Sequence, residues 1–225
     1  MTPATLLGLM RLASPALPVG GYSYSDGLEA AIDAGVVHDE TSAGDWLIDQ
    51  LHLGLARADL PLLAQAHAAW QAHDGARVAE LTRWWLATRE TSELRAQTEQ
   101  MGRSMLDWLE PQLPPDDPSI ATLDAASPTW PLAFALAALH TGADAEATLL
   151  AYAYTWAENG VQAALKAVPL GQRAGQRMLA RLAADLPPLV DAARQIGDDQ
   201  RIAWLPLLAI RSAQHETQYS RLFRS

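Results

Sequence analysis

Residues 144–167 read "DAEATLLAYAYTWAENGVQAALKA", and this stretch decides the fold class. Its apolar residues recur with helical periodicity, and Pro169 follows closely enough to end a helix there. We therefore predict a helix from Asp144 to Ala167, which is the longest helix expected in this chain.

The same periodicity extends outward in both directions. Helices are predicted at about residues 3–12, 26–35, 41–55, 59–73, 77–87, 94–108, 131–140, 170–186 and 205–214. No stretch of alternating polarity between turn residues indicates a strand, and no repeat of fixed period is found. The prediction is an all-α fold, a single globular domain of about ten helices over residues 1–225. Within it, residues 1–26 form an N-terminal helix and turn, and residues 216–225 form a docking tail.

Prolines mark several of the expected boundaries. Thr2 followed by Pro3 is typical of a helix cap with proline at the first helical position. Residues 111–129 contain "PQLPPDDPS" and are expected to form an exposed loop, because proline lacks a backbone donor and clashes with the preceding turn. For the same reason, Pro187 and Pro188 are expected to break or kink the helix that follows Pro169.

Composition excludes several classes of function. The net charge is −10 and the pI is about 4.9, so the basic footprint of a nucleic-acid-binding protein is missing. The absence of cysteine excludes disulfides, thiol catalysis and thiolate metal sites. The first ten residues contain no lysine or arginine, so they lack the positively charged region of a signal peptide. The apolar run from Pro131 to Leu139 is too short to span a bilayer. We expect a cytoplasmic protein without a membrane partner.

The stretch "ASPALPVGGYSYSDGLE" at residues 13–29 allows two interpretations. Gly20 and Gly21 before a helix start could cradle a phosphate. A phosphate loop, however, needs a preceding strand and a lysine, and here a helix precedes and no lysine is present. Asp26 and Glu29 have the spacing of an acidic capping box, with Gly35 as the C-terminal cap. A rigid turn between two helices is therefore the favoured interpretation.

No catalytic set is visible in the sequence. The six histidines lack the spacing of a helical metal pair and are expected at the surface or at helix caps. Ser23 and Ser25 have no nearby histidine, so no nucleophile with a base and an orienting group is found. His215 and Glu216 are adjacent and could bind a cation at an interface, although two residues make a weak signal.

Two further features suggest contact with another protein. Lys166, the only lysine, lies in the last turn of the predicted long helix, where a cation complements the helix dipole. At the end of the chain, Tyr219, Leu222 and Phe223 alternate with arginines, and residues 211–225 carry a side-chain charge of +2. Aromatic residues and arginine are enriched at interface hot spots, so we interpret this tail as a docking segment.

Three stretches of the sequence form a recognisable set: "LMRLASPALPVGGYSYSDGLEAAIDAG" at residues 9–35, "ALKAVPLGQ" at residues 164–172 and "SAQHETQYSRLFRS" at residues 212–225. Together they resemble the urease accessory protein UreF family. Their order and spacing match the family, and the resemblance covers essentially the whole chain. It implies an all-α, non-catalytic protein that helps to deliver nickel to the urease apoprotein. It also implies a complex with the accessory protein UreD (UreH), recruitment of the GTPase UreG, and a homodimer within that complex.

The resemblance also implies roles for individual residues. Tyr22, with Tyr24 beside it, matches the aromatic position linked to the dimer and to recruitment of the GTPase. Lys166 and Pro169 match a Lys-x-Val-Pro motif on the surface associated with the GTPase. The tail associated with UreD comprises His215, Glu216, Tyr219, Ser220, Arg221, Leu222, Phe223 and Arg224. Gln214 stands where the family often has arginine, so the salt bridge that this arginine implies across the interface is not expected here.

Two hypotheses for the function remain. The first is a scaffold that binds UreD and UreG and gates GTP-dependent nickel insertion, with nickel and GTP handled by the complex and no cofactor bound tightly by this chain. The second is a direct nickel carrier that uses His215, Glu216 and the acidic net charge. A helical enzyme is a distant third interpretation, because no polar triad supports it.

Overall fold

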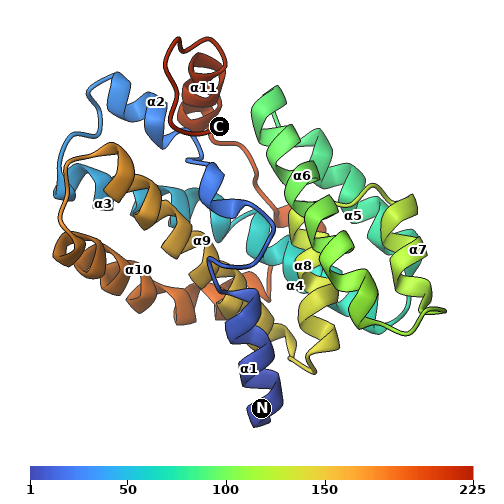
Figure 1. The fold of residues 1–225 in the computed structure, drawn as a ribbon. Coiled ribbons are helices and arrows are strands. Elements are labelled where there is room, and N and C mark those ends of the chain that lie inside the picture. Colours follow the sequence, from blue (N-terminus) through green and yellow to red (C-terminus); the bar gives the residue numbers. More distant parts are fainter. Residues whose placement is uncertain (225) are drawn as a thin grey trace.

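The computed structural model describes residues 1–224, and within that range the chain forms eleven α-helices and no strand (Figure 1). They are α1 Pro3–Leu12, α2 Leu28–Asp33, α3 Glu40–Gln50, α4 Asp59–Gln71, α5 Gly75–Ala87, α6 Ser92–Leu109, α7 Pro118–Ala125, α8 Trp130–His140, α9 Ala145–Ala167, α10 Gln172–Ala193 and α11 Pro206–His215. The all-α prediction is confirmed, and α9 is the longest helix. No helix within residues 1–224 is long and apolar enough to cross a membrane.

Local capping explains where several helices begin and end. The Thr2 hydroxyl accepts a hydrogen bond from the backbone N–H of Thr5, and Pro3 opens α1, as predicted. Asp144 caps α9 in the same way, by accepting from the N–H of Ala147. Gly35 follows α2 with φ of +70°, the left-handed geometry that lets glycine terminate a helix.

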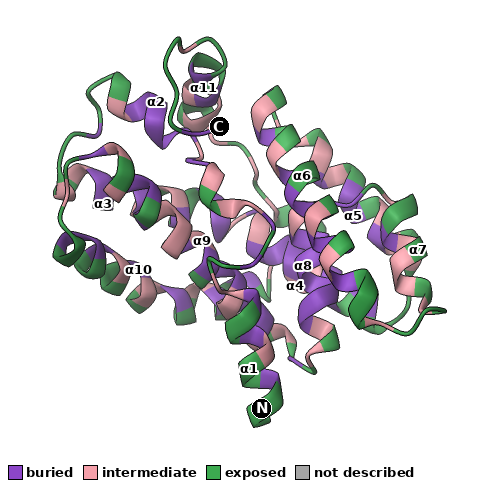
Figure 2. Ribbon diagram, viewed as in Figure 1, coloured by how far each residue is buried: buried purple, intermediate pink, exposed green. Residues whose placement is uncertain are grey.

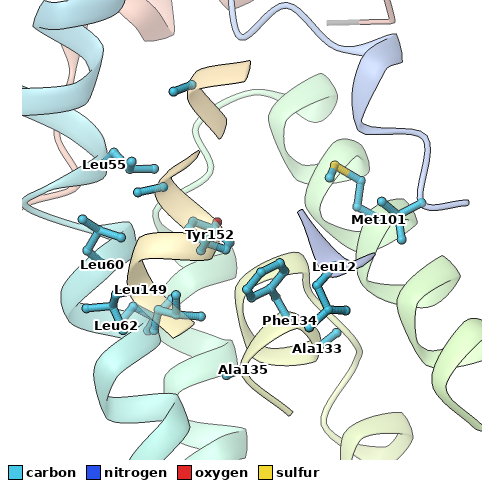
Figure 3. Close-up of a cluster of buried hydrophobic side chains, with 14 of the residues drawn as sticks. Leu12, Leu55, Leu60, Leu62, Met101, Ala133, Phe134, Ala135, Leu149 and Tyr152 are labelled. Carbon is cyan, nitrogen blue, oxygen red and sulfur yellow. The ribbon is translucent and has the colours of Figure 1, made fainter. Parts of the chain in front are cut away.

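Helix α8 forms the centre of the molecule. It carries no charged residue, and its side chains from Pro131 to Ala138 are all buried. A helix that is apolar all round must be surrounded, and α4 and α6 supply most of that cover, with α1, α7 and α9 completing it. Figure 3 shows Phe134 of α8 beside Tyr152 of α9, and the two rings meet edge to face with centroids 5.2 Å apart. Figure 2 shows how burial differs between helices: α8 is mostly buried, whereas α7 and α10 have more exposed segments.

One cluster of buried apolar residues extends from Leu9 in α1 to Phe223 near the end of the chain. Helices α9 and α10 pack closely against each other, and a Cβ added at Gly175 of α10 would lie 2.7 Å from a methyl group of Leu165. Both ends of the chain therefore contribute to the same core as the long helices.

Two expectations about proline were wrong. The predicted loop at residues 111–129 contains α7, in which Pro118 occupies the first helical position and Asp117 caps the helix. Leu123 of α7 is fully buried, so this short helix is held by packing. Helix α10 also continues through Pro187 and Pro188, so the break expected there is wrong.

The helix α10 persists because its apolar residues share one face. Leu182, Leu186 and Val190 are buried on both sides of the proline pair. Their burial offsets the cost of about 3 kcal/mol for each of the two prolines in the helix interior.

The predicted helix at residues 41–55 differs from the structure in one detail, since α3 ends at Gln50 and is followed by one turn of π-helix at Leu51–Leu55.

Candidate functional site

Three segments that are far apart in the sequence meet at Lys166. This residue lies in the last turn of α9, and its ammonium nitrogen is 5.5 Å from the ring centroid of Tyr22 and 5.5 Å from that of Phe223. The same nitrogen lies 3.5 Å from the backbone oxygen of Tyr22. A cation held against two aromatic rings gains cation–π attraction from each. The N-terminal turn, the end of α9 and the tail therefore form one surface.

Left-handed backbone geometry shapes the N-terminal turn. Gly20 and Gly27 have φ of +76° and +74°, and Asp26, which directly precedes Gly27, has φ of +50°. The predicted turn between two helices is present, but the predicted acidic capping box is wrong. Gly27 is the cap residue of α2, and the Asp26 carboxylate instead accepts a hydrogen bond from the Gln97 side chain of α6 at 2.7 Å.

The two tyrosines of this turn differ in exposure. Tyr22 is 55% exposed, whereas Tyr24 is 6% exposed and its hydroxyl donates to the Gln100 side chain at 2.9 Å. Burial raises the pKa of Tyr24, and the side chain of Arg224 beside it opposes that rise. Tyr22 is therefore free to contact another protein, while Tyr24 packs inside this chain.

His215, at the end of α11, lies between two carboxylates and has no exposed surface. Its Nδ1 is 2.7 Å from Glu93 Oε2, and its Nε2 is 3.1 Å from Glu29 Oε2. The expectation of surface or capping histidines is wrong for this residue. It is also wrong for His67, which is buried with Nε2 3.0 Å from the backbone oxygen of Ala143.

The tail continues from His215 by folding back onto its own chain. Glu29 accepts the backbone N–H groups of Leu222 at 2.7 Å and Phe223 at 2.9 Å. The Arg221 guanidinium is 2.8 Å from Glu93, and the N–H of Arg224 donates to the backbone oxygen of Ser23 at 2.8 Å. Phe223 is buried as a result, and the tail is packed against both α2 and α6.

Several of the sequence-predicted residues remain on the surface. Tyr219 is fully exposed and Leu222 is 70% exposed, although the backbone of Leu222 is held by Glu29. The remaining exposed members are Lys166, Pro169, Glu216, Ser220, Arg221 and Arg224. Glu216 accepts from the Ser92 hydroxyl at 2.5 Å, and this hydrogen bond lowers the pKa of its carboxyl. We call the exposed set Tyr22, Lys166, Tyr219 and Leu222 the composite surface.

A cavity of about 130 Å³ lies inside the helices, and sequence reasoning missed it. Asp26, Asp59 and Arg89 contribute charged groups to its wall, and Trp85 and Tyr152 contribute aromatic ones. Burial raises the pKa of Asp59 to about 6, and the hydroxyl of Tyr152 donates to this carboxyl at 3.3 Å. The sequence placed Asp26 and Asp59 only at the starts of helices. Nothing in the neighbouring residues predicted that their side chains would line a cavity.

Neither the composite surface nor the cavity contains a metal-binding cluster. Within residues 1–224, no group of three or more histidine, aspartate or glutamate side chains is arranged to hold a metal ion. His215 and Glu216, the candidate cation pair, point to different partners, because His215 faces Glu29 and Glu93 while Glu216 faces Ser92.

The fold and the composite surface define an all-helical protein in which both chain ends pack against the longest helix. Comparisons with known proteins give the family. A sequence model of the UreF family matches residues 37–183. Proteins named urease accessory protein UreF from Polaromonas sp. and Methylibium petroleiphilum are 61% and 59% identical, and each alignment covers 99% of this chain and 95% or 94% of the relative. A UreF from Azoarcus sp. is 48% identical over 98% of this chain and 95% of its own length.

The chain belongs to the urease accessory protein UreF family. The family model leaves out both chain ends, whereas the alignments with the relatives extend over nearly the whole chain. The resemblance inferred from the three sequence stretches is therefore confirmed.

Proposed function

We propose that this chain is a non-catalytic scaffold in urease maturation, which binds UreD and UreG through the composite surface and gates GTP-dependent nickel insertion. In this proposal the urease apoprotein joins the same cytoplasmic assembly, and the chain acts as a homodimer there. Nickel and GTP are handled by the assembly, and no cofactor is bound tightly by this chain. Family membership supports a role in urease maturation, and the geometry at Lys166 supports the composite surface as the place where partners bind.

The single observation that carries the proposal is the meeting of Tyr22, Lys166 and the tail. Each of these segments was associated with a partner through a separate sequence stretch, and the structure brings them together around one cation. Large side chains of the tail are exposed, since Tyr219 and Leu222 face solvent, and Glu29 holds the backbone N–H of Leu222. Exposed aromatic and apolar groups on a rigid support are suited to protein binding, because little side-chain entropy is lost on association.

The roles of the two halves of this surface can be separated. Tyr22 and Lys166 lie at the N-terminal turn and α9, and we assign them to the homodimer and to UreG. Tyr219 and Leu222 lie on the tail, and we assign them to UreD. A nickel carrier is the alternative, but the separate orientations of His215 and Glu216 give it no support.

The test is co-purification of the full chain with UreD and UreG after single substitutions. Tyr219→Ala is expected to weaken capture of UreD by at least about tenfold, the loss typical of an interface hot spot. Tyr22→Ala is expected to retain UreD and lose UreG. The matched control is Tyr154→Ala, which removes an exposed tyrosine of α9 that lies about 18 Å along the helix from Lys166.

The proposal fails if Tyr22→Ala and Tyr219→Ala behave like Tyr154→Ala while all three proteins keep the helical content of the parent chain. The carrier alternative is tested separately by calorimetry with nickel. Stoichiometric binding to the isolated chain that disappears in His215→Ala would favour the carrier over the scaffold.

A further inference from the structure

Glu29, His215 and Glu93 form a largely buried arrangement that the scaffold proposal does not use. They come from α2, α11 and α6, and 186 residues of sequence separate Glu29 from His215. Both ring nitrogens of His215 lie within hydrogen-bond distance of a carboxylate oxygen, at 2.7 Å and 3.1 Å. We call these three residues the clamp.

The clamp requires a particular protonation state of its histidine. An ionised carboxylate can only accept hydrogen bonds, whereas a neutral imidazole has one donor nitrogen and one acceptor nitrogen. Two carboxylates are therefore satisfied together only by the doubly protonated, positively charged ring. Loss of that proton would leave one nitrogen lone pair facing a carboxylate, with both groups removed from water.

The clamp also holds the end of the chain. Glu29 accepts the N–H groups of Leu222 and Phe223 in addition to His215, and Glu93 accepts the guanidinium of Arg221. The carboxylates that bind the imidazole are thus the same ones that fix the tail. A change in the charge of His215 acts directly on the groups that position residues 221–223.

Other charged groups lie around the clamp, on the tail, at the end of α11 and on α9. Arg221 faces Glu93 from the tail, and Glu216 is bonded to Ser92 and to the N–H of Glu93 at the start of α6. Lys166 of α9 lies against Phe223, and Arg224 lies beside Tyr24. Arginine and lysine side chains stay charged near neutral pH, whereas histidine is the residue type whose charge is sensitive to pH in this range.

We propose that the clamp is a proton-operated switch that docks the tail onto this chain. With the proton on His215, Glu29 and Glu93 are bridged and residues 221–224 lie against the N-terminal turn. Without it, the bridge between the carboxylates is lost, and the tail leaves its site together with Phe223. The composite surface around Lys166 therefore exists in its complete form only in the protonated state.

Amide hydrogen exchange of the full chain tests this switch without any partner protein. The N–H groups of Leu222 and Phe223 donate to the buried Glu29, and that of Arg224 donates to Ser23, so all three are protected when the tail is docked. After correction for the intrinsic exchange rate, their protection is expected to fall at least about tenfold between about pH 6 and about pH 9. Amides in α8 should keep their protection over the same range.

Two variants test whether the pH dependence of the tail amides depends on His215. His215→Gln is neutral at every pH, so its tail amides are expected to be weakly protected already at about pH 6 and to show no further change at about pH 9. The matched control is His52→Gln, which removes another histidine paired with a carboxylate, Asp185 at 2.8 Å, on the surface between the π-turn and α10. The control should keep the pH dependence of the parent chain.

Equal protection of these amides in the parent chain at both pH values overturns the switch, whether or not His215→Gln folds. A loss of protection that is the same in α8 as in the tail also overturns it, because this would indicate general unfolding. Pronounced pH dependence that survives in a folded His215→Gln variant would show that another group is responsible.

Discussion

At the scale of the residue, Asp59 shows how burial turns a helix-start residue into a titrating group. It is the first residue of α4, where a carboxylate normally benefits from the helix dipole. Here desolvation is the larger effect, and it raises the pKa to about 6 despite the nearby charge of Arg89. Ionised Asp59 is therefore a cost to the folded chain at neutral pH.

The protonation of Asp59 differs between the folded and the unfolded chain, and this difference sets how stability changes with pH. The folded chain keeps the proton on Asp59 up to about pH 6, whereas the unfolded carboxyl loses it near 3.8. Between these values unfolding releases a proton, so the free energy of unfolding falls as the pH rises. The penalty is complete above about pH 6, and Asp59→Asn is expected to remove about 1–3 kcal/mol of it.

Urea unfolding at about pH 5 and about pH 8 measures this effect. Asp59→Asn should be more stable than the parent chain at the higher pH, with a smaller difference at the lower one. Asp107→Asn, an exposed carboxylate of α6, is the control and should change the stability by less than about 0.5 kcal/mol at both. A variant less stable than the parent at about pH 8 would contradict the assignment.

Glu29 shows the limit of reading a residue from its neighbours. Its spacing from Asp26 predicted a capping role, yet its carboxylate accepts hydrogen bonds from His215, Leu222 and Phe223. Both interpretations place a carboxylate at the start of α2, and nothing local in the sequence distinguishes them. The difference arises because the tail supplies donors that lie nearly two hundred residues away.

At the scale of the element, the crossing of α6 with the start of α8 depends on Gly102. A Cβ at this position would lie 2.6 Å from backbone atoms of Pro128 and Thr129, a separation that no rotamer change can relieve. Alanine is intrinsically the better helix residue by about 1 kcal/mol. We nevertheless expect Gly102→Ala to lower the free energy of unfolding by about 1–3 kcal/mol, because the backbone must shift.

Gly160→Ala in α9 is the matched control for that substitution. Its Cβ would meet the end of the flexible Leu47 side chain at 2.7 Å, and this side chain can turn away. In urea unfolding, Gly102→Ala should therefore be clearly less stable than Gly160→Ala. Equal stabilities of the two variants would show that the close approach of α6 to residues 128–129 is not tight.

Helices α7 and α10 contain prolines at positions where the sequence predicted a loop or a break. Pro118 lies at the first helical position, where its missing donor would have no partner in any case. In α10 the prolines do remove backbone donors, but the apolar face formed by Leu182, Leu186 and Val190 keeps the helix in place. Propensity predicts the cost of these prolines correctly, and tertiary packing decides that the helix forms.

At the scale of the whole molecule, the two chain ends should be energetically coupled. The rings of Tyr22 and Phe223 lie at equal distances from the Lys166 nitrogen, so each ring helps to fix the cation for the other. A double-mutant cycle with Tyr22→Ala and Phe223→Ala is expected to give a coupling of at least about 0.5 kcal/mol in the free energy of unfolding. Strictly additive effects would indicate that the ends pack independently.

The sequence by itself determined the all-α class, most helix positions, the cap at Thr2 and the terminator at Gly35. These features depend on apolar periodicity and on capping groups within a few residues, which a single chain displays directly. The motif stretches around Tyr22, Lys166 and His215 also gave the family, which the relatives confirm. Their partner roles stay predictions.

Only the tertiary structure decided how those stretches are joined. It buried His215 between Glu29 and Glu93, turned Tyr24 inward and Tyr22 outward, and placed Asp59 in a cavity wall. The physical reason is that a buried polar group needs a partner, and which partner it meets is set by the crossing of distant helices. Local periodicity can show that a residue lies on a helix, but it carries no information about what that helix packs against.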